Sequence, residues 1–343
     1  MSLQQRLEAS WARRGPLAWG LWPLSLLYRL GLMARRALLA AGLMREERLT
    51  VPVVVVGNLV AGGAGKTPAV MAVDALLRQQ GWTPGIVSRG YGRRGDSLLA
   101  VEPDTPASLC GDEPLLLRLR TTAPVQVGRD RPAAGRALLQ RRPEVNILVS
   151  DDGLQHRRLA RDAQLIVFDE RGAGNGLLLP AGPLREPLAE RTPPRSVVVY
   201  NAPAATVGWP GSVVERGLAG AVALDAWWRG EAPNLPALTG LAGRPLLAVA
   251  GVARPGRFFA MLREHGLGFA ELALPDHHAF TTLPWPATTA DVILTEKDAV
   301  KLPPGTALGA TRVWVATLDF RLAAESEDAL CKLLPAPPQP ARE

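Results

Sequence analysis

The stretch from Val51 to Thr67, VPVVVVGNLVAGGAGKT, constrains the fold more than any other part of the chain. A run of valines that ends at a glycine is typical of a strand buried on both faces of a parallel sheet. The residues after Thr67 carry apolar side chains at helical spacing, so the stretch predicts a strand, a glycine-rich loop and a helix. A phosphate-binding loop requires this order, because backbone N–H groups and the positive end of a helix then face phosphate.

Within this loop, Lys66 is expected to reach the β- and γ-phosphates of a nucleotide, and the Thr67 hydroxyl to hold Mg²⁺. The usual spacing G-x-x-x-x-G-K-[ST] requires glycine at position 60, where this chain has Val60. Its glycines lie instead at Gly57, Gly62, Gly63 and Gly65. A glycine-rich turn that binds nothing is the alternative. Lysine usage argues against it, because only four of the 39 basic residues are lysines and one of them occupies this position.

Length and composition indicate a folded protein with an anionic partner. The 343 residues suffice for two domains, and 47% hydrophobic with 21% charged residues is typical of a globular chain. A net charge of +7 and an isoelectric point near 10.1 favour nucleotide, nucleic acid or membrane as the partner. Cys110 and Cys331 are the only cysteines and fit no metal-ligand pattern. A disulfide framework is therefore not expected, which suits a reducing compartment.

Residues 1–50 differ from the rest of the chain, with eight arginines against three acidic residues. The run from Leu17 to Met33 is largely apolar and rich in tryptophan, but Pro23 and Arg29 interrupt it. A membrane span needs about 20 apolar residues. We therefore expect a helix at the membrane surface, with aromatic rings at headgroup level and arginines on anionic lipid. A helix packed on the protein's own core and a true span are the alternatives.

The middle of the chain alternates strand and helix patterns, and two of its turns carry paired acidic residues. Val145–Ser150 predicts a buried strand, and Asp151 and Asp152 follow at its carboxyl end. In nucleotide-binding folds, the carboxylates that organise Mg²⁺ lie at this position. A solvated turn is the alternative. Asp112 and Glu113 open an apolar helix, where acidic residues can also serve only as partners of the helix dipole.

Two loops are further candidates for function. Ser88–Arg93, SRGYGR, places arginines around a Gly-Tyr-Gly turn and suits an anion, although a plain basic turn is the alternative. Gly174–Glu186 is long and non-periodic, and such loops in compact domains usually carry function. We interpret residues 201–240 as connecting structure. A second α/β pattern begins at Pro245.

Eight motifs follow one another along the chain: GNLVAGGAGKTP, SRGYGR, GDEP, DDGLQHRRLARD, LLPAGPLREP, GVARPGRFF, PDHH and TEKDAVK. In this order and over nearly the whole length, the chain resembles the tetraacyldisaccharide 4′-kinase family, the lipid A kinases of Gram-negative bacteria, which likewise lack glycine at the position of Val60. The resemblance implies an α/β fold: a P-loop NTPase-like parallel-sheet core with a second, smaller α/β domain and an N-terminal membrane-associated helix. The implied ranges are 1–50 for the helical segment, 51–240 for the kinase core, and 241–335 for the smaller domain, which contributes to an interdomain active site.

The resemblance also implies an activity, the transfer of the ATP γ-phosphate to the 4′-hydroxyl of tetraacyldisaccharide 1-phosphate to form lipid IVA. Asp112 matches the base that takes the hydroxyl proton and His277 its partner; because they fall in different predicted domains, their pairing would require domain closure. The implied ATP-binding residues are Gly62, Gly63, Gly65, Lys66 and Thr67. The implied Mg²⁺ ligands are Thr67, Asp151, Asp152 and Glu186. The implied substrate contacts are Tyr91, Arg131, His156 and Arg185.

Such an enzyme is expected to be a monomer at the cytoplasmic face of the inner membrane, where it meets its acylated acceptor, and to bind no nucleic acid. A P-loop GTPase or transport ATPase is one alternative, because Thr295–Asp298, TEKD, comes close to a guanine-recognition motif. A nucleic-acid-binding protein is another. The basic excess, however, lies in an apolar, tryptophan-rich segment and not in a stripe of basic and stacking residues.

Overall fold

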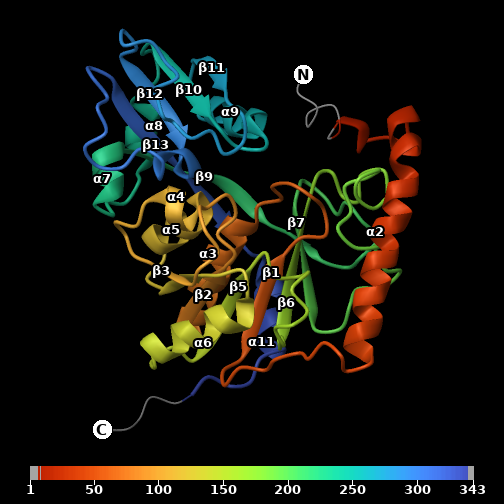
Figure 1. The fold of residues 1–343 in the computed structure, drawn as a ribbon. Helices are drawn as coiled ribbons and strands as arrows, with labels where there is room; N and C mark the ends of the chain where they lie inside the picture. The colour runs from red at the N-terminus through yellow and green to blue at the C-terminus, as the bar shows by residue number, and fades with distance from the viewer. Residues whose placement is uncertain (1–6, 8, 339–343) are drawn as a thin grey trace, which may run out of the picture. The chain divides into compact units, whose positions relative to one another are not determined.

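The computed structural model describes residues 7 and 9–338, which fall into two compact units (Figure 1). Unit 1 comprises the described parts of Met1–Arg89, Gly128–Val214 and Leu322–Glu343. Unit 2 comprises Gly90–Val127 and Glu215–Arg321. Each unit is therefore assembled from segments that are separated in the sequence.

Unit 1 is built on parallel strands flanked by helices. The central strand β1 (Val53–Gly57) lies between β5 (Ile147–Asp151) and β6 (Ala163–Asp169), within the order β2-β5-β1-β6-β7-β8. All these neighbours pair in parallel. The remaining strands are β2 (Pro84–Ser88), β7 (Ser196–Asn201) and β8 (Ser212–Val213). The helices are α2 (Pro16–Ala40), α3 (Lys66–Gln79), α6 (Arg131–Arg141) and α11 (Ala324–Lys332).

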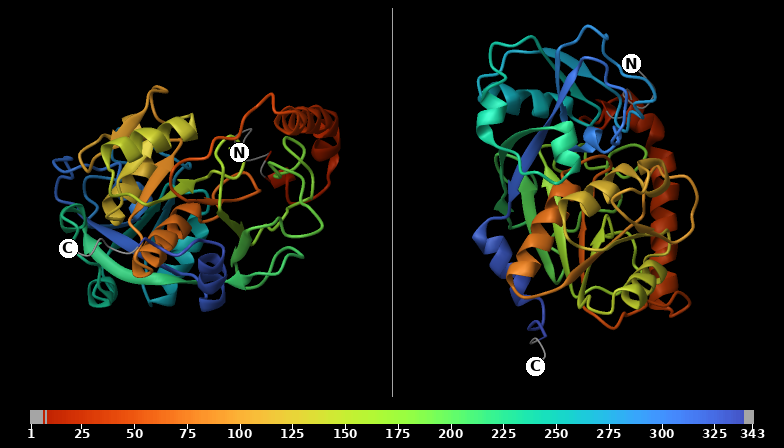
Figure 2. Two further views of the ribbon diagram at one scale, coloured as in Figure 1. Left: turned by 90° about the horizontal axis from the view of Figure 1, so that it is seen from below. Right: turned by 90° about the vertical axis from the view of Figure 1, so that its left-hand side faces the viewer.

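The valine run forms the centre of this sheet because its alternate side chains can face helices on opposite sides. Val53 and Val55 are buried in a core that includes Leu138 of α6. Helix α3 contacts β1, β2 and β5 from the other face (Figure 2). The predicted strand, loop and helix, and the parallel-sheet core around them, are thus confirmed.

Helix α2 confirms the predicted N-terminal helix and leaves most of its apolar side chains uncovered. It starts with Pro16 in its first turn and continues through Pro23. Only Ala18 and Ser25 are buried in it. Its exposed large apolar residues are Leu17, Trp19, Trp22, Leu24, Leu26, Leu27, Leu30, Met33 and Leu38. Among the described residues, no helix is long and apolar enough to cross a membrane.

Polar contacts attach α2 to the long loop between β6 and β7. Ser25 Oγ donates to the carbonyl of Leu178 at 2.9 Å and accepts from the N–H of Ala181 at 3.0 Å. Tyr28 Oη donates to the carbonyl of Arg185 at 2.9 Å. The helix therefore shares a hydrogen-bonded framework with the loop that carries the LLPAGPLREP motif.

Unit 2 has its own sheet, in the order β11-β10-β12-β13-β9. Only β9 runs antiparallel to its neighbour. The strands are β9 (Glu215–Ala223), β10 (Leu246–Ala250), β11 (Ala270–Ala273), β12 (Asp291–Thr295) and β13 (Arg312–Arg321). The helices that accompany them are α7 (Leu224–Trp228), α8 (Leu235–Thr239), α9 (Pro255–Glu264) and α10 (Glu296–Ala299). The core combines Leu238 of α8 and Phe259 of α9 with Ile293 of β12.

The segment Gly90–Val127 also belongs to unit 2 and contains two short strands and two helices. Strands β3 (Leu99–Val101) and β4 (Val125–Val127) pair antiparallel, and α4 (Ala107–Cys110) precedes α5 (Asp112–Arg120). Helix α5 contacts β3, β4 and α10. Because α5 begins at Asp112, its acidic pair lies at the positive end of the helix.

The structure differs from the sequence interpretation in residues 201–240. We interpreted them as connecting structure, but they contain β8, β9, α7 and α8. Strand β9 is rich in glycine and alanine and contains a single β-branched residue, Val222, so its sequence signals a strand only weakly. Its pairing with β13 defines it. The two units also group the chain differently from the predicted ranges 51–240 and 241–335, because Gly90–Val127 and Glu215–Arg321 belong to unit 2.

Candidate active site

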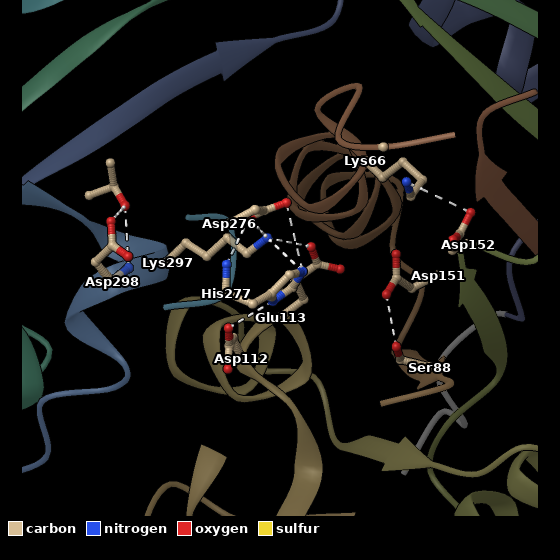
Figure 3. Close-up of polar contacts among 12 residues, drawn as sticks. Lys66, Ser88, Asp112, Glu113, Asp151, Asp152, Asp276, His277, Lys297 and Asp298 are labelled. Atoms are coloured by element: carbon tan, nitrogen blue, oxygen red, sulfur yellow. Dashed lines mark hydrogen bonds and ion pairs between the residues drawn. The ribbon is translucent and has the colours of Figure 1, made fainter. Parts of the chain in front are cut away.

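Side chains of unit 1 hold the loop between β1 and α3 in place. Asn58 Nδ2 donates to the carbonyls of Val60 at 2.6 Å and Gly62 at 3.3 Å. Asn58 Oδ1 accepts from Lys66 Nζ at 3.3 Å, and the same ammonium lies 3.8 Å from a carboxylate oxygen of Asp152 (Figure 3). The lysine is therefore already oriented by the loop and by the residue that follows β5.

The start of α3 depends on the glycine before it. Gly65 has φ of +92°, and a Cβ there would lie 2.3 Å from Asn201 Nδ2, so only glycine fits. Asn201, at the end of β7, donates to the carbonyl of Ala64 at 3.0 Å. Lys66 and Thr67 open the helix, where backbone N–H groups have no intrahelical partner and favour an anion.

Two carboxylates with different partners lie at the end of β5. Asp151 is buried and accepts a hydrogen bond from Ser88 Oγ at 2.8 Å. Asp152 accepts from Arg185 Nη1 at 2.7 Å. Burial on its own would raise the pKa of Asp152, but the charges of Lys66 and Arg185 lower it below its usual value. Asp152 is therefore ionised at neutral pH.

Arg131 and His156 are two further residues predicted to contact the substrate. Arg131 is only 1% exposed, and its guanidinium donates to the carbonyls of Gly128 at 2.7 Å and Asp151 at 3.2 Å. Burial, followed by the charges of Arg131 and Arg89, lowers the pKa of His156 to about 4. The imidazole of His156 is therefore neutral near pH 7.

Glu186 lies among arginines. Its carboxylate pairs with Arg157 at 2.6 Å and with Arg36 of α2 at 3.1 Å. These residues border a cavity of about 460 Å³ whose wall also includes Leu39 and Trp209. The cavity thus combines basic and apolar groups next to the N-terminal helix.

A second polar cluster lies in unit 2, where His277 Nδ1 and Asp112 Oδ2 are 3.0 Å apart (Figure 3). Burial on its own would raise the pKa of Asp112, but the hydrogen bond with His277 and the charges of Lys301 and Lys297 lower it. Lys297 Nζ also lies 3.1 Å from a Glu113 carboxylate oxygen. Asp112 is therefore ionised, whereas the neighbouring Glu113 is engaged by a lysine.

Comparison with known proteins identifies the family of this chain. The family model for tetraacyldisaccharide-1-P 4′-kinase (LpxK) matches residues 17–335. The chain belongs to this kinase family. It is 57% identical over 329 residues to the tetraacyldisaccharide 4′-kinase of Methylibium petroleiphilum, covering 93% of this chain and 90% of the relative. It is 54% identical to that of Leptothrix cholodnii, covering 97% of each chain.

A solved structure supports the same assignment. The crystal structure of LpxK from Aquifex aeolicus, described as an "apo" form in complex with ATP, superposes with a TM-score of 0.75 at 27% identity. The match covers 93% of this chain and 99% of the other. The P-loop kinase fold inferred from the motifs is thereby confirmed.

In this kinase, the predicted metal ligands do not all share one environment. Thr67, Asp151 and Asp152 supply hydroxyl and carboxylate oxygens, the donor type that Mg²⁺ prefers when waters or phosphates complete its shell. These donors fit the ion. Glu186 instead contacts Arg36 and Arg157. Within residues 7 and 9–338, no three His, Cys, Asp or Glu side chains gather as a metal site.

The structure corrects one expectation about Asp112 and His277. Both belong to unit 2 and already form a hydrogen bond, so their pairing does not require closure between domains. The reason is that the segment Gly90–Val127, which carries α5, groups with unit 2, to which His277 also belongs. Tyr91 is also in unit 2; its ring lies 5.6 Å from the His277 ring and is 68% exposed.

Sequence analysis did not identify four residues that organise these clusters. Asn58 and Asn201 hold the phosphate loop, and Arg171 donates to the carbonyl of Ala61 at 2.8 Å while it pairs with a buried aspartate. Asn58 lies within the GNLVAGGAGKTP motif but was given no role, whereas Arg171 and Asn201 lie outside all eight motifs. Lys297 could have been identified from the sequence, because it is one of only four lysines in a chain that otherwise uses arginine, as Lys66 is.

Proposed function

We propose that this family member transfers the γ-phosphate of ATP to the 4′-hydroxyl of tetraacyldisaccharide 1-phosphate, which yields the bisphosphorylated lipid A precursor lipid IVA. The observation that carries the proposal is the loop before α3, where Gly65, Lys66 and Thr67 present an oriented ammonium and a helix start. The names of the related kinases and the ATP in the Aquifex aeolicus structure support the choice of acceptor and nucleotide.

In this proposal, the residues of unit 1 bind and neutralise phosphate. The N–H groups at the start of α3 and the Lys66 ammonium stabilise the charge on the transferring group. Thr67, Asp151 and Asp152 would hold Mg²⁺, which supplies further charge neutralisation on the phosphate oxygens when bound. Little covalent chemistry is required of the protein, because positioning and electrostatics account for most of the catalysis.

Asp112 acts as the general base. Its carboxylate takes the proton of the 4′-hydroxyl as the oxygen forms its bond to the γ-phosphorus and the bond to the ADP oxygen breaks. The lowered pKa of Asp112 supports this role, because the group is ionised throughout the neutral range. Glu113 is the adjacent alternative, but the Lys297 ammonium occupies its carboxylate at 3.1 Å.

The acylated acceptor suggests where the enzyme acts. We propose that α2 lies on the cytoplasmic face of the inner membrane, with its exposed leucines and tryptophans in the headgroup region. The cavity beside Arg36 and Glu186 has the mixed basic and apolar lining that a phosphorylated, acylated sugar requires. It is a candidate site for part of the acceptor, and we propose that a monomer suffices for the reaction.

The GTPase alternative rests on Thr295–Asp298, and the structure accounts for this tetrapeptide without a nucleotide. Thr295 caps α10 by accepting from the N–H of Asp298 at 3.2 Å, and its hydroxyl donates to the Asp298 carboxylate at 2.7 Å. The same carboxylate accepts from the N–H of Gly251 at 2.9 Å. These internal bonds make the motif a helix cap.

The decisive experiment incubates the purified chain with ATP, Mg²⁺ and detergent-dispersed tetraacyldisaccharide 1-phosphate, and detects the product by mass spectrometry. A gain of one phosphate on the sugar opposite the 1-phosphate is expected. A parallel reaction with GTP tests the nucleotide. Hydrolysis of ATP without transfer to the lipid, or a clear preference for GTP, would contradict the proposal.

A further inference from the structure

Helix α2 has a polar side in addition to its exposed apolar residues, and this side contacts the segments that follow β5 and β6 (Figure 1). Tyr28 Oη donates to the carbonyl of Arg185 at 2.9 Å. Arg35 Nη2 donates to the carbonyl of Gln155 at 2.6 Å. Burial, followed by the charge of Glu186, raises the pKa of Tyr28, so its hydroxyl stays protonated and can donate. Two donors on one face of the helix, two turns apart, thus hold two separate backbone carbonyls.

Both contacted residues direct their own side chains toward the phosphate loop. Arg185 Nη1 donates to the two carboxylate oxygens of Asp152 at 2.7 and 2.9 Å. Gln155 Nε2 donates to the carbonyl of Asn58 at 3.4 Å, and its Oε1 accepts from Arg185 Nη1 at 3.4 Å. Asp152 and Asn58 are both partners of Lys66 Nζ, at 3.8 and 3.3 Å (Figure 3). Two linked series of contacts therefore run from α2 to the lysine ammonium.

These contacts matter because a lysine side chain does not orient itself. Its flexible four-carbon stem can adopt many rotamers, whereas a contact with a transferring phosphate requires one. Lys66 and Asn58 are both buried. In such a place, a partner that moves away leaves a polar group that water cannot readily satisfy. The position of the ammonium therefore depends on the groups that hold its partners.

We propose that Tyr28 and Arg35 of α2 are positioning residues for Lys66. Tyr28 acts through Arg185, and Arg35 acts through Gln155. The inference rests on the proposed function, in which the lysine ammonium binds the phosphates of ATP. It gives α2 a second role in addition to the proposed membrane contact: its polar side orders the nucleotide site, and its apolar side is left for lipid.

The first test measures nucleotide affinity and turnover in the full-length enzyme. Tyr28→Phe and Arg35→Met should each weaken binding of ATP with Mg²⁺, measured by calorimetry, and lower kcat on detergent-dispersed acceptor, each by about tenfold, as expected when a group that orients a functional side chain is lost. Arg35→Lys keeps a donor and should retain most of both. Arg29→Met is the matched control, because it removes the same charge from an exposed position of the same helix. Both values should be unchanged in it.

The second test asks whether Tyr28 acts through Arg185. Arg185→Met removes the guanidinium that binds Asp152 but keeps the backbone carbonyl that accepts from Tyr28. In this background, adding Tyr28→Phe should cause almost no further loss of ATP affinity, because the series of contacts is already interrupted. A purely structural contribution of the hydroxyl would instead multiply the two losses.

Two results would overturn the inference. One is ATP affinity and kcat in Tyr28→Phe and Arg35→Met equal to those of Arg29→Met. The other is a full further loss from Tyr28→Phe in the Arg185→Met background. If Tyr28→Phe does not fold, the comparison of Arg35→Met with Arg29→Met still decides. Failure of the proposed function is distinguishable from both, since it would appear as a wild-type enzyme that binds ATP but does not phosphorylate the lipid.

Discussion

Among single residues, Lys66 and Thr67 are the ones on which the proposed phosphoryl transfer depends most. Replacing either with alanine should lower phosphoryl transfer by about 10²–10³-fold, the usual cost of losing one preorganised group that stabilises the transition state. The fold should persist, because Asp152 keeps Arg185 as an ion-pair partner after Lys66 is removed. Steady-state transfer rates and circular dichroism measure the two effects. Near wild-type turnover of Lys66→Ala would contradict the assignment of the phosphate loop.

Asp112 and Glu113 are adjacent, chemically similar and separable by substitution. Asp112→Ala should lower kcat by about 10²–10⁴-fold with little change in ATP affinity, because a general base is lost. His277→Ala should cost less, and the double variant should lose less than the product of the two single losses, since the pair acts as a unit. Glu113→Ala should be the mildest, because that carboxylate pairs with Lys297. A Glu113→Ala enzyme more impaired than Asp112→Ala would assign the base to the other carboxylate.

His156 makes stability depend on pH in a defined window. Its pKa of about 4 in the folded chain lies below the ordinary value of 6.5. Between these values the unfolded chain binds a proton that the folded chain does not, so the free energy of unfolding falls as pH drops from 6.5 toward 4. Urea unfolding near pH 7.5 and pH 5 should show a larger loss for the wild type than for His156→Gln. Equal losses would mean that His156 does not contribute.

Individual elements differ in how well the sequence predicts them. The strand and helix around the phosphate loop could be predicted because valine repetition, glycine and helical spacing all agree. Strand β9 could not, since its glycine- and alanine-rich sequence gains its structure from pairing with β13, far along the chain. Asn201 was equally unpredictable, because its contact with Ala64 depends on the order of strands in the sheet.

Helix α2 allows the proposed membrane contact to be tested at exposed positions. Leu27 and Leu30 are 64% and 59% exposed, and burying each in lipid should contribute about 1.5–3 kcal/mol. Leu27→Glu and Leu30→Glu should therefore weaken binding to anionic vesicles by about tenfold or more each, measured by co-sedimentation at low salt. Leu235→Glu, at an exposed leucine of unit 2 that is 46% exposed, is the matched control. Equal binding of all three variants and the wild type would contradict contact through α2.

For the molecule as a whole, the sequence predicted the kinase family better than it predicted which segments make up the two units. Asp112 and His277 are 165 residues apart, and only the family resemblance paired them; spacing or periodicity could not have done so. The resemblance carried no information about which segments pack together. The composition of the two units follows from the β9–β13 ladder and from the contact of α5 with α10, and both are long-range contacts that local pattern leaves open.

Nucleotide binding should be visible in the stability of the whole chain and separable from catalysis. A ligand that binds only the folded state stabilises it by about 2.7 kcal/mol at a free concentration near 100 times its Kd. ATP with Mg²⁺ should therefore shift urea unfolding to higher denaturant for the wild type. Asp112→Ala should show the same shift, because its carboxylate acts on the acceptor hydroxyl, whereas Lys66→Ala should show much less. If Asp112→Ala lost the shift as fully as Lys66→Ala, Asp112 would contribute to nucleotide binding and the base assignment would need another residue.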